Sequence, residues 1–137
     1  MSDTRRVTLT WAGEGRSFRG GSGSSAPIAI DGSSAEGPSP METLLLSVCG
    51  CMAIDIRDIL GKGRVPVEGL VIEAAGDRAP DPPRRFTRIE LDIRVRGPGQ
   101  ENLAKVERAV QLSRDRYCSV SHSLSPDIEV ATRIHLE

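Results

Sequence analysis

The chain has 137 residues with nearly balanced charge, 18 lysines and arginines against 19 aspartates and glutamates, and 38% of its residues are hydrophobic. A chain of this length buries about two-thirds of its unfolded surface, so we expect a single domain over residues 1–137 that needs no disulfide or structural metal. Balanced charge argues against a nucleic-acid-binding protein, which would carry a basic excess. No apolar run approaches the roughly 20 residues of a membrane span, and the N-terminus lacks the apolar region of a signal peptide. We therefore expect a cytoplasmic protein with neither nucleic-acid nor membrane partners.

The first 31 residues are predicted to form three short strands. Val7, Leu9 and Trp11 alternate with polar residues, which is the pattern of a strand with one apolar face. Turns rich in glycine and serine separate this strand from the two that follow. The predicted strands are residues 5–11, 16–20 and 26–30.

A long helix is predicted from Pro40 to Leu60. Ser39, Pro40 and Glu42 form a capping box with proline at the first helical position, and Gly61 supplies the glycine that often follows a helix. Apolar residues extend around more than one side of this helix. A single small subunit has little with which to cover such a helix, so we expect two copies to pack their central helices together in a homodimer.

The second half is predicted to add two strands, a helix, a short helical turn and a last strand. Their ranges are residues 65–75, 86–96, 101–116, 118–124 and 128–136. The order β-β-β-α-β-β-α-(α)-β, with strands grouped in hairpins, indicates an α+β fold with antiparallel sheets around the long central helix. In residues 86–96 the charged residues at alternate positions are expected to face solvent or a polar groove, and they are Arg88, Glu90, Asp92, Arg94 and Arg96. The arginine-rich segment is therefore interpreted as a solvated strand face.

Three cysteines are an odd number in a chain without an export signal, which disfavours a disulfide scaffold and suggests catalytic or redox-sensing thiols. Cys49 and Cys51 lie two positions apart on the long helix, about 200° around its axis, so they cannot serve one site. Only two histidines are present and no four-ligand zinc spacing exists, so we expect no metal and no cofactor.

Two further features accompany these thiols. Asp55 follows Cys51 by one helical turn at the edge of the apolar stripe, where it needs a backbone donor, an arginine or the other subunit as a partner. Cys118 is predicted to begin a short helix, where free backbone N–H groups stabilise a thiolate, with His122 one turn further on. The alternatives are a buried cysteine acting as a small hydrophobic residue and an exposed or capping histidine.

Four motifs resemble the OsmC/Ohr family of thiol peroxidases, closest to its small YhfA-type branch. They are GPSPMETLLL at 37–46, GCMAID at 50–55, KGR at 62–64 and YCSVS at 117–121. In that family a proline-initiated central helix carries the peroxide-attacking cysteine eleven residues after the proline, which is the spacing of Pro40 and Cys51. The strand order matches the family fold over nearly the whole chain.

The resemblance implies an intertwined bacterial homodimer with two sites at the subunit interface. Cys51 would attack an organic hydroperoxide and become a sulfenic acid, and Cys118 would resolve it to a disulfide that an external thiol or dithiol reduces. This would be a cysteine-based peroxidase in the oxidative-stress response. Cys49 has no counterpart in the family and is interpreted as a packing residue.

One position departs from the peroxidase branches. There, an arginine from the N-terminal strands activates the thiolate and is held by a glutamate directly after the helix-starting proline. Here that position is Met41, and Glu42 follows one residue later, where a capping role is at least as well supported. Arg19 is the better candidate for the activating arginine and Arg16 the second. The alternative function is a binding or redox-sensing protein with an apolar pocket at the dimer interface and little turnover.

Overall fold

The computed structural model describes residues 3–137 and divides them into two compact units. The first unit ends at Leu44, and the second is Leu45–Glu137. Each unit is described by itself below. In this described part of the chain, no helix is both long enough and apolar enough to cross a membrane.

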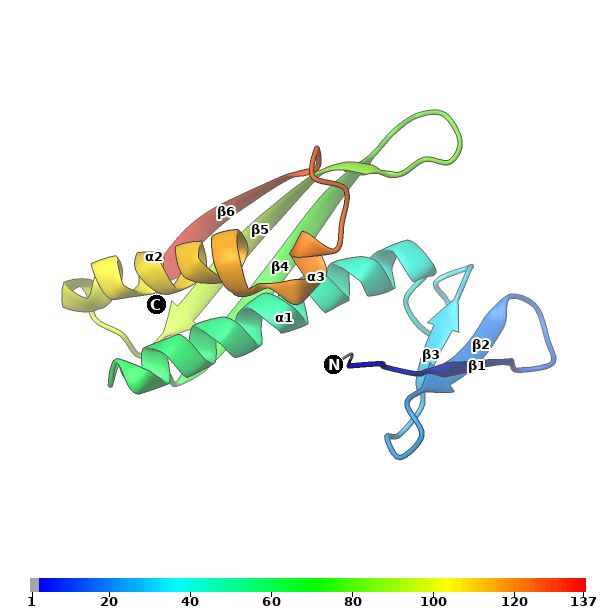
Figure 1. The fold of residues 1–137 in the computed structure, drawn as a ribbon, viewed down its shortest axis with the longest axis horizontal. Coiled ribbons are helices and arrows are strands. Elements are labelled where there is room, and N and C mark those ends of the chain that lie inside the picture. The colour runs from blue at the N-terminus through cyan, green and yellow to red at the C-terminus, as the bar shows by residue number, and fades with distance from the viewer. Residues whose placement is uncertain (1–2) are drawn as a thin grey trace. The chain divides into compact units, whose positions relative to one another are not determined.

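The first unit contains a three-stranded antiparallel sheet of β1 (Thr8–Trp11), β2 (Ser17–Gly21) and β3 (Ile28–Asp31), in that order (Figure 1). Gly13 and Gly15, both with positive φ, form the turn between β1 and β2. Glycine reaches this conformation without the steric cost that a side chain would add. The three predicted strands are present, each beginning one to three residues later than the sequence pattern indicates.

Helix α1 (Pro40–Lys62) begins where the sequence predicts. The N–H of Ser39 donates to Oε1 of Glu42 at 2.9 Å, and the N–H of Glu42 donates to Oγ of Ser39 at 3.2 Å. These two bonds are the reciprocal pair of a capping box, which satisfies donors that the first helical turn leaves unpaired.

The end of α1 differs from the prediction by two residues. The N–H of Val65 donates to the carbonyl of Leu60 at 2.9 Å, and that of Arg64 donates to Gly61 at 3.1 Å. These are the two bonds of a Schellman motif, whose left-handed position is occupied by Arg64 with φ of 59°. Gly61 therefore lies inside the helix, and the position that glycine prefers carries an arginine.

The second unit contains a three-stranded sheet in the order β4 (Gly69–Arg78), β5 (Phe86–Arg96), β6 (Glu129–Leu136). Strands β4 and β5 are antiparallel, as expected for a hairpin. Strand β6 runs parallel to β5, so the expectation of purely antiparallel sheets is corrected for this pair. The α+β class and the element order are confirmed.

The parallel pair follows from the connection between its strands. Between β5 and β6 the chain forms η1 (Gln100–Asn102), α2 (Leu103–Leu112), η2 (Ser113–Tyr117) and α3 (Ser119–His122). Parallel strands require such a crossover, because the chain must return to the end of the sheet at which the first strand began. The predicted helix over 101–116 is thus a 3-10 turn, an α-helix and a π turn in succession.

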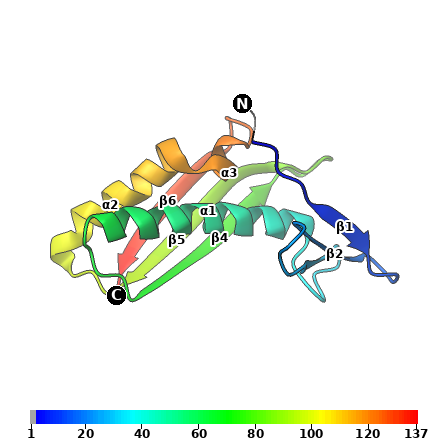
Figure 2. The same ribbon diagram turned by 60° about the horizontal axis from the view of Figure 1, so that its bottom comes forward.

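The core of the second unit lies between this sheet and the helices on one of its faces. Figures 1 and 2 show α1 and α2 running over the same face. The inward side chains of β5 and the seams of α1 and α2 are almost fully buried. These residues are Ile89, Leu91, Ile93, Val95, Val48, Met52, Ile56, Leu60, Val106, Ala109 and Val110.

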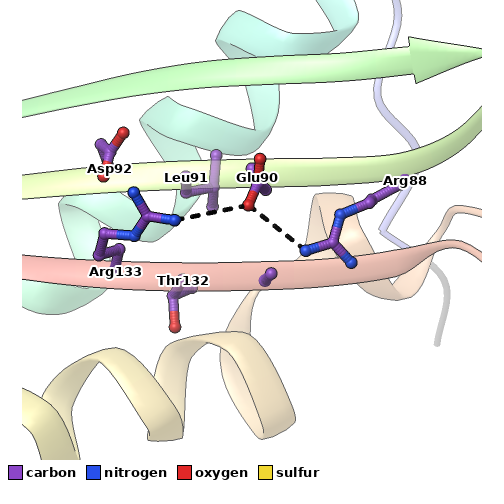
Figure 3. A pocket seen from close by; sticks show the side chains of 7 residues that line it. Arg88, Glu90, Leu91, Asp92, Thr132 and Arg133 are labelled. Carbon is purple, nitrogen blue, oxygen red and sulfur yellow. Dashed lines mark hydrogen bonds and ion pairs between the residues drawn. The ribbon is translucent and has the colours of Figure 1, made fainter.

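The opposite face of the sheet is charged. Figure 3 shows a pocket there in which Glu90 of β5 pairs with Arg88 at 3.4 Å and with Arg133 of β6 at 3.8 Å. His135 lies 3.2 Å from Asp92 on the same face. Because carboxylates lie among the arginines and pair with basic side chains, the arginine-rich segment is a solvated strand face, as predicted.

Several large apolar side chains remain exposed in each unit. On α1, Leu46 and Ile54 are 59% and 63% exposed, which confirms that the apolar surface of this helix extends beyond its buried seam. In the first unit, Val7, Leu9 and Trp11 are more than half exposed.

Candidate redox site

Two of the three cysteines meet in the second unit. Cys51 is partly buried on α1, and Cys118 is fully buried at the junction of η2 and α3. Burial raises the pKa of Cys118, and the neighbouring Cys51 thiol raises it further through a side-chain hydrogen bond and through charge. Residues far apart in the sequence are therefore neighbours through their sulfur atoms.

The Cys118 sulfur has one further partner. The N–H of Ser121 donates to Sγ of Cys118 at 3.4 Å, and the Ser121 hydroxyl donates to the Cys118 carbonyl at 3.2 Å. Burial has the largest effect on the pKa of Cys118, and the bonds from Ser121 lower that pKa without cancelling the rise. Cys118 caps the short helix α3, as the sequence predicts, but it remains a protonated thiol near neutral pH.

Ser113 fixes the backbone that precedes Cys118. Its carbonyl accepts the N–H of Cys118 at 2.7 Å, five residues on, which closes the π turn η2. Its hydroxyl, fully buried, donates to Oδ2 of Asp55 at 2.8 Å. The partner that Asp55 needs is thus a serine, rather than a backbone donor, an arginine or a second subunit.

Sequence reasoning missed the role of Ser113, which lies within the helix predicted over 101–116 and is fully buried. The available signal was a pair of polar residues, one in each of two otherwise apolar helix seams. A serine interrupts one apolar seam, an aspartate sits at the edge of another, and each requires a polar partner when buried. One sequence does not show that these two seams face each other.

His122 contacts the backbone at both ends of the segment that carries Cys118. Its Nδ1 lies 2.9 Å from the Cys118 carbonyl oxygen and its Nε2 lies 3.0 Å from that of Asp115. The side chain is exposed, so His122 clamps the main chain and does not contact the sulfur.

Cys49 lies apart from this pair, as the helical spacing predicts. It is partly buried, and burial raises the pKa of its thiol. Its surroundings favour the neutral form, which is the unreactive form of a cysteine.

The remaining candidates, Arg19, Arg16 and Glu42, belong to the first unit. Arg16 donates to the carbonyl of Gly32 and is held by that contact. Arg19 is exposed on β2, and within residues 3–137 its guanidinium has neither a hydrogen bond nor an ion pair. Of the two arginines, Arg19 is therefore the one whose charge is uncommitted.

Glu42 is committed to the start of α1. The N–H of Ser39 and the hydroxyl of Ser34, at 2.7 Å, both donate to its carboxylate, and these bonds lower the pKa of Glu42. Within the residues described, Glu42 has no ion pair with an arginine. Its geometry is that of the capping box.

An α+β chain with two neighbouring thiols, one buried and one more accessible, defines a dithiol protein. Residues 32–133 match the family model described as OsmC-like protein, and the chain belongs to this family. The matched range contains Glu42, Cys51 and Cys118, whereas Arg16 and Arg19 precede it.

Relatives and solved structures agree with this assignment. The chain is 41% identical to protein YhfA of Escherichia coli K12 over 126 residues, covering 91% of this chain and 92% of that protein. A crystal structure of a hypothetical protein from Aquifex aeolicus has a TM-score of 0.82 and 27% identity, with 99% of both chains covered. The organic hydroperoxide resistance protein OhrB of Bacillus subtilis has a TM-score of 0.63 at 15% identity, with 97% and 98% covered.

Proposed function

We propose that this protein is a thiol-dependent peroxidase that reduces organic hydroperoxides to alcohols as part of an oxidative-stress defence. The observation that carries the proposal is the contact between the thiols of Cys51 and Cys118. The fold shared with an organic hydroperoxide resistance protein supports the same conclusion.

In the first step, the Cys51 thiolate attacks the terminal oxygen of the hydroperoxide. The O–O bond breaks, the alkoxide leaves and takes a proton to become the alcohol, and Cys51 becomes a sulfenic acid. Cys51 is the more accessible of the two sulfurs, since Cys118 is fully buried. The substrate therefore meets Cys51 first.

In the second step, the Cys118 sulfur attacks Sγ of the Cys51 sulfenic acid. The S–S bond forms, the S–O bond breaks, and the leaving hydroxide combines with the proton of Cys118 as water. An external thiol or dithiol then reduces the disulfide and is itself oxidised, which returns both cysteines to thiols.

Activation of Cys51 needs a nearby cation, because a cysteine in the middle of a helix gains little from the helix dipole. We assign this role to Arg19, whose guanidinium is exposed and unpaired within the described residues. Glu42 would act by fixing the start of α1 through its capping box rather than by holding an arginine.

The functional molecule is proposed to be an intertwined cytoplasmic homodimer without metal or cofactor. The exposed Leu46 and Ile54 on α1 supply apolar surface for a second copy. The partners would then be this second copy, the hydroperoxide and the external reductant.

Peptide mapping under non-reducing conditions tests the proposal. Reduced protein is mixed for a few seconds with one equivalent of cumene hydroperoxide, quenched with an alkylating agent, digested and analysed by mass spectrometry. We expect a Cys51–Cys118 disulfide in the wild type, and a sulfenic acid at Cys51 in Cys118→Ser that dimedone traps. Cys49→Ser is the matched control and should form the same disulfide as the wild type.

A second function is favoured by the commitment of Glu42 to the capping box. If no cation activates Cys51, the protein would bind an apolar ligand or sense oxidants without efficient turnover. Unmodified thiols after hydroperoxide treatment, or oxidation of Cys49 as fast as Cys51, would overturn the peroxidase proposal in favour of this one.

A further inference from the structure

A part-buried polar contact lies one helical turn from Cys51 and is not used in the steps above. Asp55 on α1 accepts a 2.8 Å hydrogen bond from the hydroxyl of Ser113, which is completely buried. A fully buried hydroxyl is unfavourable unless it has a polar partner, and the partly buried Asp55 carboxylate supplies one. Such a contact therefore fixes the two segments that carry it in one relative position.

Both ends of this contact are connected to a cysteine. Asp55 follows Cys51 by four residues on α1, and side chains at this spacing are neighbours on one helix face. Ser113 accepts the backbone N–H of Cys118 through its carbonyl at 2.7 Å. A short path thus runs from Cys51 through the helix to Asp55, across to Ser113, and on to the backbone of Cys118.

The π turn explains why this contact matters for Cys118. In η2 (Ser113–Tyr117), the five-residue hydrogen bond replaces the regular helical pattern, and the chain leaves the helix at Cys118. Single π turns of this kind are rare and are frequently found at functional sites. Because Ser113 is the acceptor that closes the turn, a displacement of Ser113 displaces Cys118 with it.

We propose that Asp55 and Ser113 are positioning residues that hold the Cys118 sulfur against Cys51. This inference rests on the proposed function, since it concerns the step in which Cys118 displaces hydroxide from the Cys51 sulfenic acid. In this proposal the Asp55–Ser113 contact sets the distance between the two sulfur atoms. That distance in turn sets the rate and the equilibrium of disulfide formation.

The test measures how readily the two thiols pair without using a hydroperoxide. In a Cys49→Ser background, the protein is equilibrated with defined ratios of reduced and oxidised glutathione, and the disulfide fraction gives the effective concentration of one thiol at the other. A misplacement of about 1 Å lowers such effective concentrations by roughly 10-fold to 100-fold. We expect a fall of this size in Asp55→Ala and Ser113→Ala.

Asp55→Asn provides the conservative variant, because its amide oxygen can still accept from the Ser113 hydroxyl. We expect its effective concentration to lie within a few-fold of the parent. Ser125→Ala is the matched control, since it removes another serine hydroxyl that donates to an aspartate, Asp127, on an exposed loop. It should leave thiol pairing unchanged, and circular dichroism establishes that each variant is folded.

Two results overturn the inference. One is a folded Ser113→Ala or Asp55→Ala variant with the effective concentration of the parent, even if its thermal stability is lower, because the contact would then be structural only. The other is a loss in Ser125→Ala equal to that in Ser113→Ala. Failure of the peroxidase proposal is detected separately. In that case the thiols do not react with cumene hydroperoxide, whatever the result of the glutathione equilibrium.

Discussion

Cys118 is an uncharged thiol near neutral pH, and the proposed mechanism requires it to act as a nucleophile. Burial raises its pKa first, and the Cys51 thiol adds to the rise. Only a minor fraction of Cys118 is thiolate at neutral pH, and its reactivity depends on that fraction. The hydrogen bonds from Ser121 lower the pKa and so increase the thiolate fraction.

The direction of the shift predicts how disulfide formation depends on pH. A pKa raised above the ordinary thiol value of about 8.5 keeps the thiolate fraction rising beyond that pH. We therefore expect the rate at which preformed Cys51 sulfenic acid becomes a disulfide to increase from about pH 6 to above about pH 9, measured by stopped-flow mixing. A rate that levels off near neutral pH would contradict this assignment.

Ser39 is the residue on which the start of α1 depends. Its hydroxyl accepts the N–H of Glu42, and its own N–H is bonded by the Glu42 carboxylate. Replacing an N-cap serine by alanine costs about 0.5–2 kcal/mol. We expect Ser39→Ala to lower the free energy of unfolding in urea by this amount, whereas Ser24→Ala in an exposed turn should change it by less than about 0.5 kcal/mol. Equal values for the two variants would contradict the capping role.

At the scale of the elements, the turn that ends α1 places a non-glycine residue in an unfavourable backbone conformation. Arg64 takes the left-handed position of the Schellman motif, where a side chain costs about 1–2 kcal/mol. Glycine relieves this cost but also gains freedom in the unfolded chain, which offsets part of the benefit.

The net expectation for Arg64→Gly is a gain of about 0.5–1 kcal/mol in the free energy of unfolding. Gly63→Ala is the control, because Gly63 has no positive φ and an added Cβ would meet only ordinary contacts. Thermal and urea unfolding of both variants check this. A loss of stability in Arg64→Gly would show that the arginine side chain makes a contribution larger than its backbone strain.

The sequence predicted elements best where one local pattern decides the structure. Strand β5 has the predicted bounds, because its strict alternation has one buried face, and α1 begins at the predicted capping box. The predicted antiparallel direction is wrong for β6, because its alternation is the same whether it runs parallel or antiparallel to its neighbour. The predicted end of α1 is two residues too early. Glycine is the residue most often found just after a helix, which pointed to Gly61, but Arg64 occupies the left-handed position here.

The site was predictable to the extent that it follows motifs. Cys51 and Cys118 were paired through family resemblance, and the structure places them in contact within one unit. Ser113 was not predicted, because its role depends on which helix faces α1. That information resides in the packing of distant segments rather than in local spacing.

At the scale of the whole molecule, the exposed apolar residues on α1 require an explanation. Leu46 and Ile54 are more than half exposed, although they lie on the same long helix as the buried core residues Val48 and Met52. Large apolar side chains exposed on the same helix offer surface that a partner could cover. The proposed homodimer supplies that partner.

We expect the protein to sediment as a dimer and Ile54→Lys to shift it toward monomer, because a buried unpaired charge opposes association. Val71→Lys is the matched control, since Val71 is 61% exposed on the charged face of the second sheet. Sedimentation velocity over a range of concentrations measures both variants. An unchanged dimer in Ile54→Lys would exclude this side of α1 from the interface.

The crossover that the parallel pairing of β6 with β5 requires also affects when the thiols can meet during folding. The hairpin of β4 and β5 closes locally, whereas β6 joins only after the whole crossover containing Cys118 has folded back over the sheet. Contacts that span long stretches of chain form late, because the conformational entropy of closing the loop is lost before the contact stabilises the chain. We therefore expect a partly folded chain to keep Cys51 and Cys118 apart until the crossover has folded back over the sheet, and to form little of the proposed disulfide before that point.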